Sequence, residues 1–181
     1  VIHDYDVALI DRDGKGLAQA VNELKICNEH ATVKTMTMDI ADVEQAYLGM
    51  IQLVNDIGRV DVLLNSAGIA VKGTTDMSIS MFAEIQSINV NGMFAIAKAV
   101  AEKMRSQGYG YIMNLASIAG KKSRANFGAY GASKHAVVGF SGSLSKELML
   151  YGVKVTSICP GIVDTDMASD SKIANAEKIQ S

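Results

Sequence analysis

The chain has 181 residues, of which 49% are hydrophobic, and a formal net charge of -2 at pH 7. This length is enough for one sizeable core, so we expect a single domain over residues 1–181. No block of like charges occurs and no apolar run approaches the ~20 residues of a membrane span, which argues against nucleic-acid and membrane partners.

The start of the chain and its cysteines bear on the cellular compartment. Residues 1–4 lack the basic start and the long apolar middle of a signal peptide. Cys27 and Cys159 both lie in segments with apolar periodicity. We therefore expect a cytoplasmic protein in which both cysteines are buried free thiols.

Strand and helix patterns alternate in the first part of the chain. The apolar run over 6–11 is typical of a strand that is buried on both faces of a parallel sheet. Helical spacing predicts helices over 14–28 and 41–58, and strands are predicted over 32–38 and 60–65. This alternation predicts a parallel α/β layer fold with right-handed crossovers.

The second part of the chain continues the alternation. Ser78 or Ser80 can cap a helix that continues to about Gln107. Further elements are predicted as a strand over 111–116, a long helix over 127–150 and a strand over 153–159. The remainder, 162–181, is polar and contains no further strand pattern.

Tyr130 and Lys134 lie one turn apart near the start of the long helix, so they share one face. A free tyrosine has a pKa of about 10, and a neighbouring lysine ammonium should lower it. The pair would then suit proton transfer to or from an oxygen atom. The alternative is an ordinary surface pair.

Polar or turn-forming residues follow five predicted strands. They are Asp11, Asp39, Asn65 with Ser66-Ala67-Gly68, Ser117, and Pro160-Gly161. Each has an ordinary explanation in caps and turns when it is taken alone. Ligands of open α/β sheets bind at the carboxyl ends of the strands, so together these residues indicate a site.

With Asn89 and the Tyr130-x-x-x-Lys134 motif, this set resembles the short-chain dehydrogenase/reductase family in its classical branch. The segment 65–68 is similar to the family motif Asn-Asn-Ala-Gly, with serine in second place. Ser117 precedes Tyr130 by the thirteen residues usual in the family. The resemblance extends from residue 6 to about 167 and implies a Rossmann-like, doubly wound parallel sheet.

The resemblance implies four catalytic residues. Tyr130 would be the acid or base, and Lys134 would lower its pKa and bind the nicotinamide ribose. Ser117 would hold the substrate oxygen, and Asn89 would anchor a water that links Lys134 to solvent. For Asn89 the alternative is an interior amide that bonds backbone. The hydride itself belongs to the cofactor, and no metal site is expected.

The resemblance also implies a cofactor site. A carboxylate at Asp11 would bind the adenosine ribose and repel a 2′-phosphate, which favours NAD over NADP, although Arg12 could weaken the preference. The other cofactor-binding positions that match are Asp39, Ile40, Asn65, Ala67, Gly68, Tyr130, Lys134, Pro160, Gly161, Ile162, Val163 and Thr165.

The chain departs from the family at both ends. No glycine-rich phosphate loop occurs in it, and the strand that carries this loop would precede Val1. In the family's order that strand lies between those of Asp11 and Asn65, so we expect a fragment whose sheet falls into two parts with unpaired edges. Dinucleotide binding by these residues alone is expected to be weak.

The predicted activity is hydride transfer between a nicotinamide cofactor and a carbonyl or secondary alcohol, for example a 3-oxoacyl thioester. A polyol or acetoin-type dehydrogenase is the alternative, as is an inactive or regulatory relative. The family also implies a homodimer or homotetramer that pairs through the helices over 90–105 and 127–150.

Overall fold

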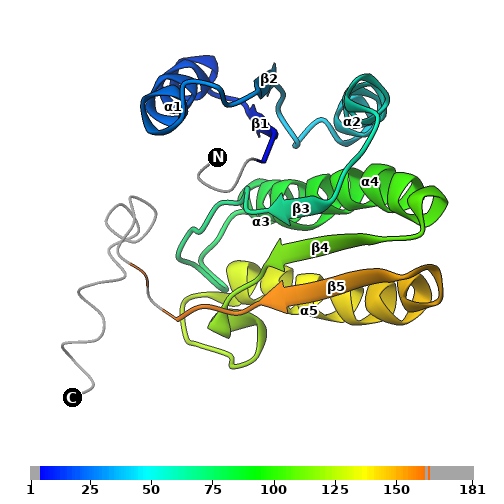
Figure 1. Cartoon of the computed structure of the whole chain (residues 1–181). Coiled ribbons are helices and arrows are strands. Elements are labelled where there is room, and N and C mark those ends of the chain that lie inside the picture. The colour runs from blue at the N-terminus through cyan, green and yellow to red at the C-terminus, as the bar shows by residue number, and fades with distance from the viewer. Residues whose placement is uncertain (1–4, 162, 164–181) are drawn as a thin grey trace.

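The computed structural model describes residues 5–161 and residue 163, and its elements alternate in type along the chain (Figure 1). They are β1 (Val7–Asp11), α1 (Gly14–Cys27), β2 (Val33–Thr37), α2 (Val43–Ile57), β3 (Val62–Asn65), α3 (Ile79–Gln86), the π-helix η1 (Ser87–Gly92), α4 (Met93–Gln107), β4 (Gly110–Leu115), the 3-10 helix η2 (Ile118–Gly120), α5 (Gly128–Leu148), the 3-10 helix η3 (Met149–Tyr151) and β5 (Val153–Ile158). The predicted α/β, Rossmann-like class is confirmed.

The described strands form two parallel sheets, as predicted. One sheet pairs β1 with β2, and the other has the order β3-β4-β5. Within the described residues, β1 and β3 each have one edge that pairs with no other strand. All five strands are parallel to their neighbours, so within each sheet the carboxyl ends of the strands lie at one edge.

The core lies between the three-stranded sheet and the helices α4 and α5, which run along one of its faces (Figure 1). Leu63 and Ile112 are buried neighbours on this face of the sheet. Ala97 and Val100 of α4 are completely buried, and α2 packs on the same helix through Ala46. Burial of this apolar surface is the main stabilising contribution to the fold.

The opposite face of the sheet is covered less. Val62 and Leu64 of β3 are 45% and 54% exposed. The prediction that β1 is buried on both faces is wrong, because Ala8 is exposed and the other apolar residues of β1 are half-buried. Among the described residues α1 packs on β1 and β2, and this leaves part of the strand accessible.

The predicted single helix from Ser78 to Gln107 contains a π-helical segment, η1. Ser78 rather than Ser80 caps it, since its hydroxyl accepts the Met81 amide. Gly92 of η1 lies against the backbone of Ile40, where an added Cβ would overlap the Ile40 carbonyl oxygen. π-Helical turns are rare and often occur at functional sites, and the helical periodicity gave no sign of this one.

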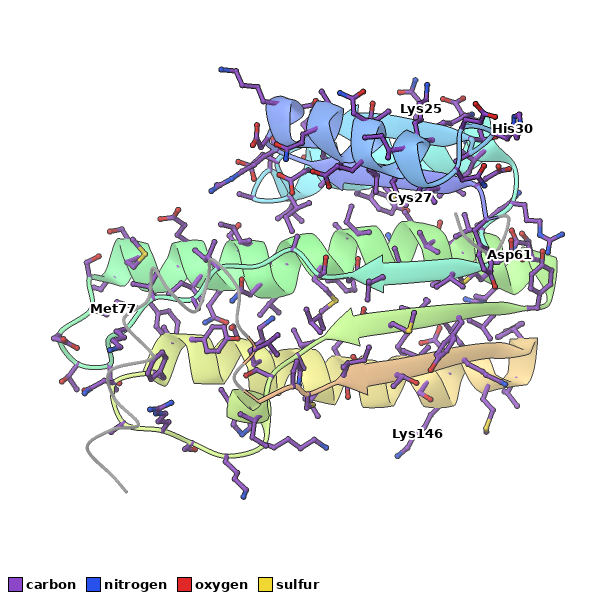
Figure 2. The ribbon with its side chains drawn as sticks, turned by 60° about the vertical axis from the view of Figure 1, so that its left-hand side comes forward. Lys25, Cys27, His30, Asp61, Met77 and Lys146 are labelled. Atoms are coloured by element: carbon purple, nitrogen blue, oxygen red, sulfur yellow. The ribbon has the colours of Figure 1, made fainter. Side chains whose placement is uncertain are left out.

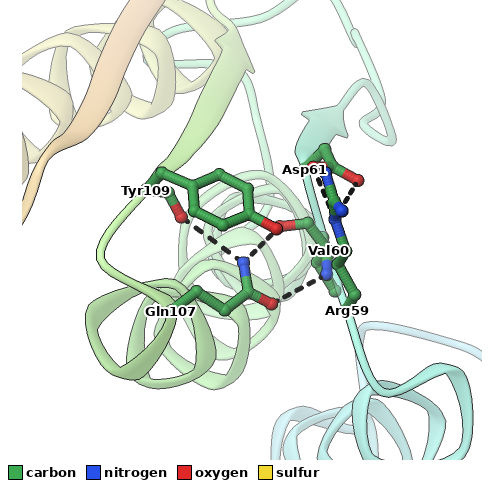
Figure 3. Close-up of polar contacts among 5 residues, drawn as sticks. All are labelled: Arg59, Val60, Asp61, Gln107 and Tyr109. Carbon is green, nitrogen blue, oxygen red and sulfur yellow. Dashed lines mark hydrogen bonds and ion pairs between the residues drawn. The ribbon is translucent and has the colours of Figure 1, made fainter.

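Gln107 holds the segment just before β3 (Figure 3). The Gln107 amide donates to the Val60 carbonyl at 2.8 Å and accepts from the Val60 amide at 3.0 Å. Figure 2 shows Asp61 and Met77 at opposite ends of the three-stranded sheet. The Gln107 contacts therefore lie at the amino ends of the strands, away from the edge that the sequence indicates as a site.

The two cysteines are free, but they are not both buried. Cys27 is exposed at the end of α1 (Figure 2), and Cys159 is half-buried. The prediction of burial for Cys27 is wrong, because this last residue of α1 is exposed. Among the described helices, none is both long and apolar enough to cross a membrane.

Candidate functional site

The carboxyl ends of β1, β2 and β3 line one cavity of about 310 Å³. Its lining residues are Ile10, Asp11, Arg12, Met38, Asp39, Ile40, Ser66, Ala67, Gly68, Ile69 and Ile88. Five of the predicted cofactor residues are thus brought together: Asp11, Asp39, Ile40, Ala67 and Gly68. Met38, Ile69 and Ile88 also line the cavity but were not predicted. The signal that could have indicated them is an apolar side chain next to a predicted strand end or helix turn.

The two cavity carboxylates are held by the turns that follow their strands. Asp11 accepts the Asp13 amide at 2.9 Å, and Asp39 accepts the Ala41 amide at 2.9 Å. Asp13 in turn caps α1 by accepting the Lys15 amide. These local bonds fix the direction of each side chain, so both carboxylates keep their places without a bound partner.

Ser117 and Tyr130 meet beside the end of β4. Ser117 follows β4 and caps η2, where its Oγ accepts the Ala119 amide at 3.1 Å. Tyr130 lies in the first turn of α5. Burial raises the pKa of Tyr130, and a hydrogen bond with Ser117 lowers it by less. The net shift of the Tyr130 pKa is therefore upward, because of burial, and the lowering effect expected of Lys134 stays a prediction.

Lys134 is 6% exposed and its Nζ donates to the Leu115 carbonyl at 2.8 Å. The Nζ atom lies over the Tyr130 ring, 5.7 Å from its centroid, which is within the range of a cation–π contact. Burial lowers the pKa of Lys134 to about 8. The ammonium form therefore still predominates at pH 7.

Gly68 joins the cavity to the Tyr130–Lys134 pair. A Cβ added at Gly68 would lie 3.6 Å from Lys134 Nζ and 3.0 Å from Asn89 Oδ1. Glycine at this position therefore allows the cavity wall to approach both side chains closely. The predicted cofactor residues and the predicted catalytic residues thus belong to one continuous region.

Asn89 is buried in η1 with its side-chain amide fully engaged. Its Oδ1 accepts the Ile69 amide at 2.8 Å, and its Nδ2 donates to the Ile69 carbonyl at 2.9 Å and to Ser133 Oγ at 3.0 Å. This is the arrangement of the alternative interpretation, an interior amide that bonds backbone. Both Nδ2 hydrogens are used, so the side chain donates to protein atoms rather than to water.

The remaining predicted residues are distributed around this region. Asn65 does not line the cavity, because its Nδ2 donates to Asn114 Oδ1 at 2.9 Å. The Pro160 carbonyl accepts the Ile118 amide at 2.8 Å, which holds the end of β5 next to Ser117. Gly161 and Val163 are exposed. The predicted positions 162 and 165 lie outside the described residues.

The chain matches the short chain dehydrogenase family over residues 1–176. An uncharacterized oxidoreductase of Staphylococcus saprophyticus is 32% identical over 174 residues, which are 96% of this chain and 74% of that protein. The chain thus spans about three quarters of that relative's length.

Two solved structures are similar over nearly the whole chain. An actinorhodin polyketide ketoreductase variant with NADPH has a TM-score of 0.86 and 28% identity, with 97% of this chain and 77% of that one covered. An NAD+-bound xylitol dehydrogenase has a TM-score of 0.80, 26% identity and the same two coverages. The protein therefore belongs to the short-chain dehydrogenase family of oxidoreductases.

Proposed function

We propose that the protein transfers a hydride between a nicotinamide dinucleotide and a carbonyl or secondary alcohol. The observation that carries this proposal is the meeting of Ser117, Tyr130 and Lys134 beside Gly68, which borders a cavity with carboxylates at its far wall. A dinucleotide supplies the hydride when it is bound. The intact set of three side chains argues against a purely regulatory relative.

Tyr130 acts as the proton donor in reduction and the acceptor in oxidation. Because burial raises its pKa, the phenol is protonated at neutral pH and ready to donate. Ser117, which lies beside the phenol and lowers its pKa, holds the substrate oxygen next to it. Lys134 carries a positive charge below about pH 8 and stabilises the negative charge that develops as Tyr130 gives up its proton.

The cavity fits the adenosine end of the cofactor, and its charges favour NAD. Asp11 offers a carboxylate to ribose hydroxyls, and its charge opposes a 2′-phosphate. Arg12 lines the same cavity and acts in the opposite direction. The two similar structures contain NADPH and NAD+ respectively, so the preference rests on Asp11. Asp39 and Ile40 would border the adenine.

The proposed substrate is a ketone such as a 3-oxoacyl thioester. Similarity to a polyketide ketoreductase supports this class. Lys121, Lys122 and Arg124 are exposed in the loop between η2 and α5, and they could receive an anionic carrier group. Similarity to a xylitol dehydrogenase supports the second candidate, a polyol.

A substrate panel tests the proposal. The complete protein is incubated with NADH or NADPH and with an acetoacetyl thioester, acetoin or a cyclic ketone, and with NAD or NADP and xylitol. We expect the thioester to be reduced fastest, with NADH. The proposal would be refuted if the folded protein turned over none of these combinations and the Tyr130→Phe variant behaved in the same way.

A further inference from the structure

Helix α5 contains two buried serines that are used in the same way. Ser133 is completely buried, and its Oγ donates to the Tyr130 carbonyl at 2.7 Å. Ser141 is 2% exposed, and its Oγ donates to the Val137 carbonyl at 2.7 Å. Because each hydroxyl has one proton, which its own helix takes, each oxygen is left to accept a bond from elsewhere.

Each serine accepts that bond from a buried asparagine of another element. Ser133 accepts Nδ2 of Asn89 in η1 at 3.0 Å. Ser141 accepts Nδ2 of Asn114 in β4 at 2.9 Å. Both asparagines are at most 1% exposed. An interior amide that lost its acceptor would carry a desolvation cost, so these bonds fix the two amides firmly.

Both asparagines continue to the same short segment, residues 65–69. Asn114 Oδ1 accepts Asn65 Nδ2 at 2.9 Å, at the start of the segment. Asn89 bonds both the amide and the carbonyl of Ile69, at its end. Residues 66–68 between these anchors line the cavity, and Gly68 adjoins Lys134. Two serine–asparagine relays from α5 therefore hold both ends of one cavity wall.

We propose that Ser133 and Ser141 are positioning residues, which set the place of the segment 65–69 relative to the Tyr130–Lys134 pair. The inference rests on the proposed function for its consequence, since this spacing would orient a bound dinucleotide toward Tyr130. Neither serine touches the cavity. Their hydroxyls act through Asn89 and Asn114, so their loss moves the wall without removing any group that contacts a ligand.

The direct test is hydrogen exchange in the complete protein without ligand. In Ser133→Ala the Asn89 amide loses an acceptor, and we expect the Ile69 amide to exchange about fivefold faster or more, the equivalent of one hydrogen bond. In Ser141→Ala the faster exchange should appear at the Asn65 end of the segment 65–69, which Asn114 holds. Ser143→Ala, an exposed serine on the same helix, is the matched control. The Gly58 amide, which bonds the Val54 carbonyl at the end of α2, is the internal reference.

The second readout is NADH affinity, measured by fluorescence titration. Each single variant should bind about fivefold more weakly than Ser143→Ala. The double variant should lose less NADH affinity than the product of the two single losses, because either substitution alone already releases the segment 65–69. If the two serines acted independently, the two losses would multiply. Faster exchange that is uniform over the protein, unchanged exchange in 65–69, or multiplying losses would each overturn the inference. If even the unaltered protein bound no dinucleotide, the proposed function would fail. The hydrogen-exchange result would still test whether Ser133 and Ser141 position the segment 65–69.

Discussion

Lys134 Nζ donates to the carbonyl of Leu115 at 2.8 Å, which ties helix α5 to the last residue of β4. Backbone thereby engages one of the three ammonium hydrogens, and the buried charge lies over the Tyr130 ring, 5.7 Å from its centroid. Its bond also sets the depth of α5 against the strand that carries Ser117. The pair thus depends on the strand end as much as on the helical spacing.

Replacing Tyr130 by phenylalanine should remove activity and leave cofactor binding nearly intact. The phenol proton is lost, but the ring keeps its edge-to-face contact with Phe127, whose centroid is 6.4 Å away. General acid catalysis contributes about 10²- to 10⁴-fold, so kcat should fall by at least that much. Steady-state rates and NADH titration measure both effects. Tyr111→Phe, which removes a hydroxyl bonded to Thr156, is the control; a wild-type rate in Tyr130→Phe would exclude the catalytic role.

Asp11→Ala should raise the efficiency with NADP relative to NAD. The substitution removes the negative charge that would face a 2′-phosphate and leaves Arg12 in the same cavity. The measurement is the ratio of kcat/KM for the two cofactors, which we expect to shift by about tenfold or more toward NADP. Asp6→Ala removes an equal charge just before β1 and should leave the ratio unchanged. The same ratio in both variants would show that Asp11 does not select the cofactor.

Lys134→Met should stabilise the protein at neutral pH while it stops turnover. Burial lowers the pKa of Lys134 to about 8 from 10.5, which corresponds to a cost of about 3 kcal/mol for the buried charge. Loss of the bond to Leu115 offsets about 1 kcal/mol of the gain. Urea unfolding at pH 7 should therefore show a higher free energy of unfolding in the variant.

The pH dependence of that difference has a definite sign. Below about pH 8 the lysine is charged in the folded and unfolded states, and the full cost is present. Between about pH 8 and 10.5 the folded state has lost the proton that the unfolded state still binds, so the stability of the unaltered protein rises with pH. The advantage of Lys134→Met should accordingly shrink over this interval. An advantage that stayed constant or grew would contradict the lowered pKa.

The complete protein should assemble through α4 and α5, by two-fold pairing of the same face. Phe94 of α4 is 45% exposed and contacts Phe140 of α5 edge-to-face, with centroids 5.5 Å apart. Exposed aromatic surface shared by two helices suits such an interface. Phe94→Asp should shift sedimentation at micromolar concentration toward monomer. Ile26→Asp, at a position 85% exposed on α1, should leave it unchanged; a monomeric unaltered protein would refute the assembly.

The strands and most helices could be predicted because their apolar periodicities are regular. The run that ends at Asp11 and the one that ends at Asn65 mark β1 and β3 to within two residues. The position of Ser117 at the end of β4 followed in the same way. The carboxyl ends of parallel strands share an edge, so the cavity residues Asp11, Asp39 and Gly68 could be placed together before any coordinates.

The electrostatics and the buried polar contacts could not be predicted from spacing. Tyr130 and Lys134 are correctly paired on one face, but the sign of the tyrosine pKa shift depends on burial, which the sequence does not show. The sequence pattern assigns no role in the site to Ser133 or Ser141. Their role depends on which asparagine faces them across the fold, which is a property of tertiary packing.

The π-helix η1 gives the long helical run a local bulge at the site. It accommodates one residue more per turn than an α-helix, and it places Asn89 against Ile69 while Gly92 meets the backbone of Ile40. The wider turn absorbs this extra residue, so α3 and α4 keep their apolar faces on the core on either side of it. Deleting one residue there would restore regular α-helix with little rotation of α4, but it would remove the local bulge that presents Asn89 to Ile69. The extra residue in η1 therefore serves the contacts of the site, and the direction of the helix that follows does not depend on it.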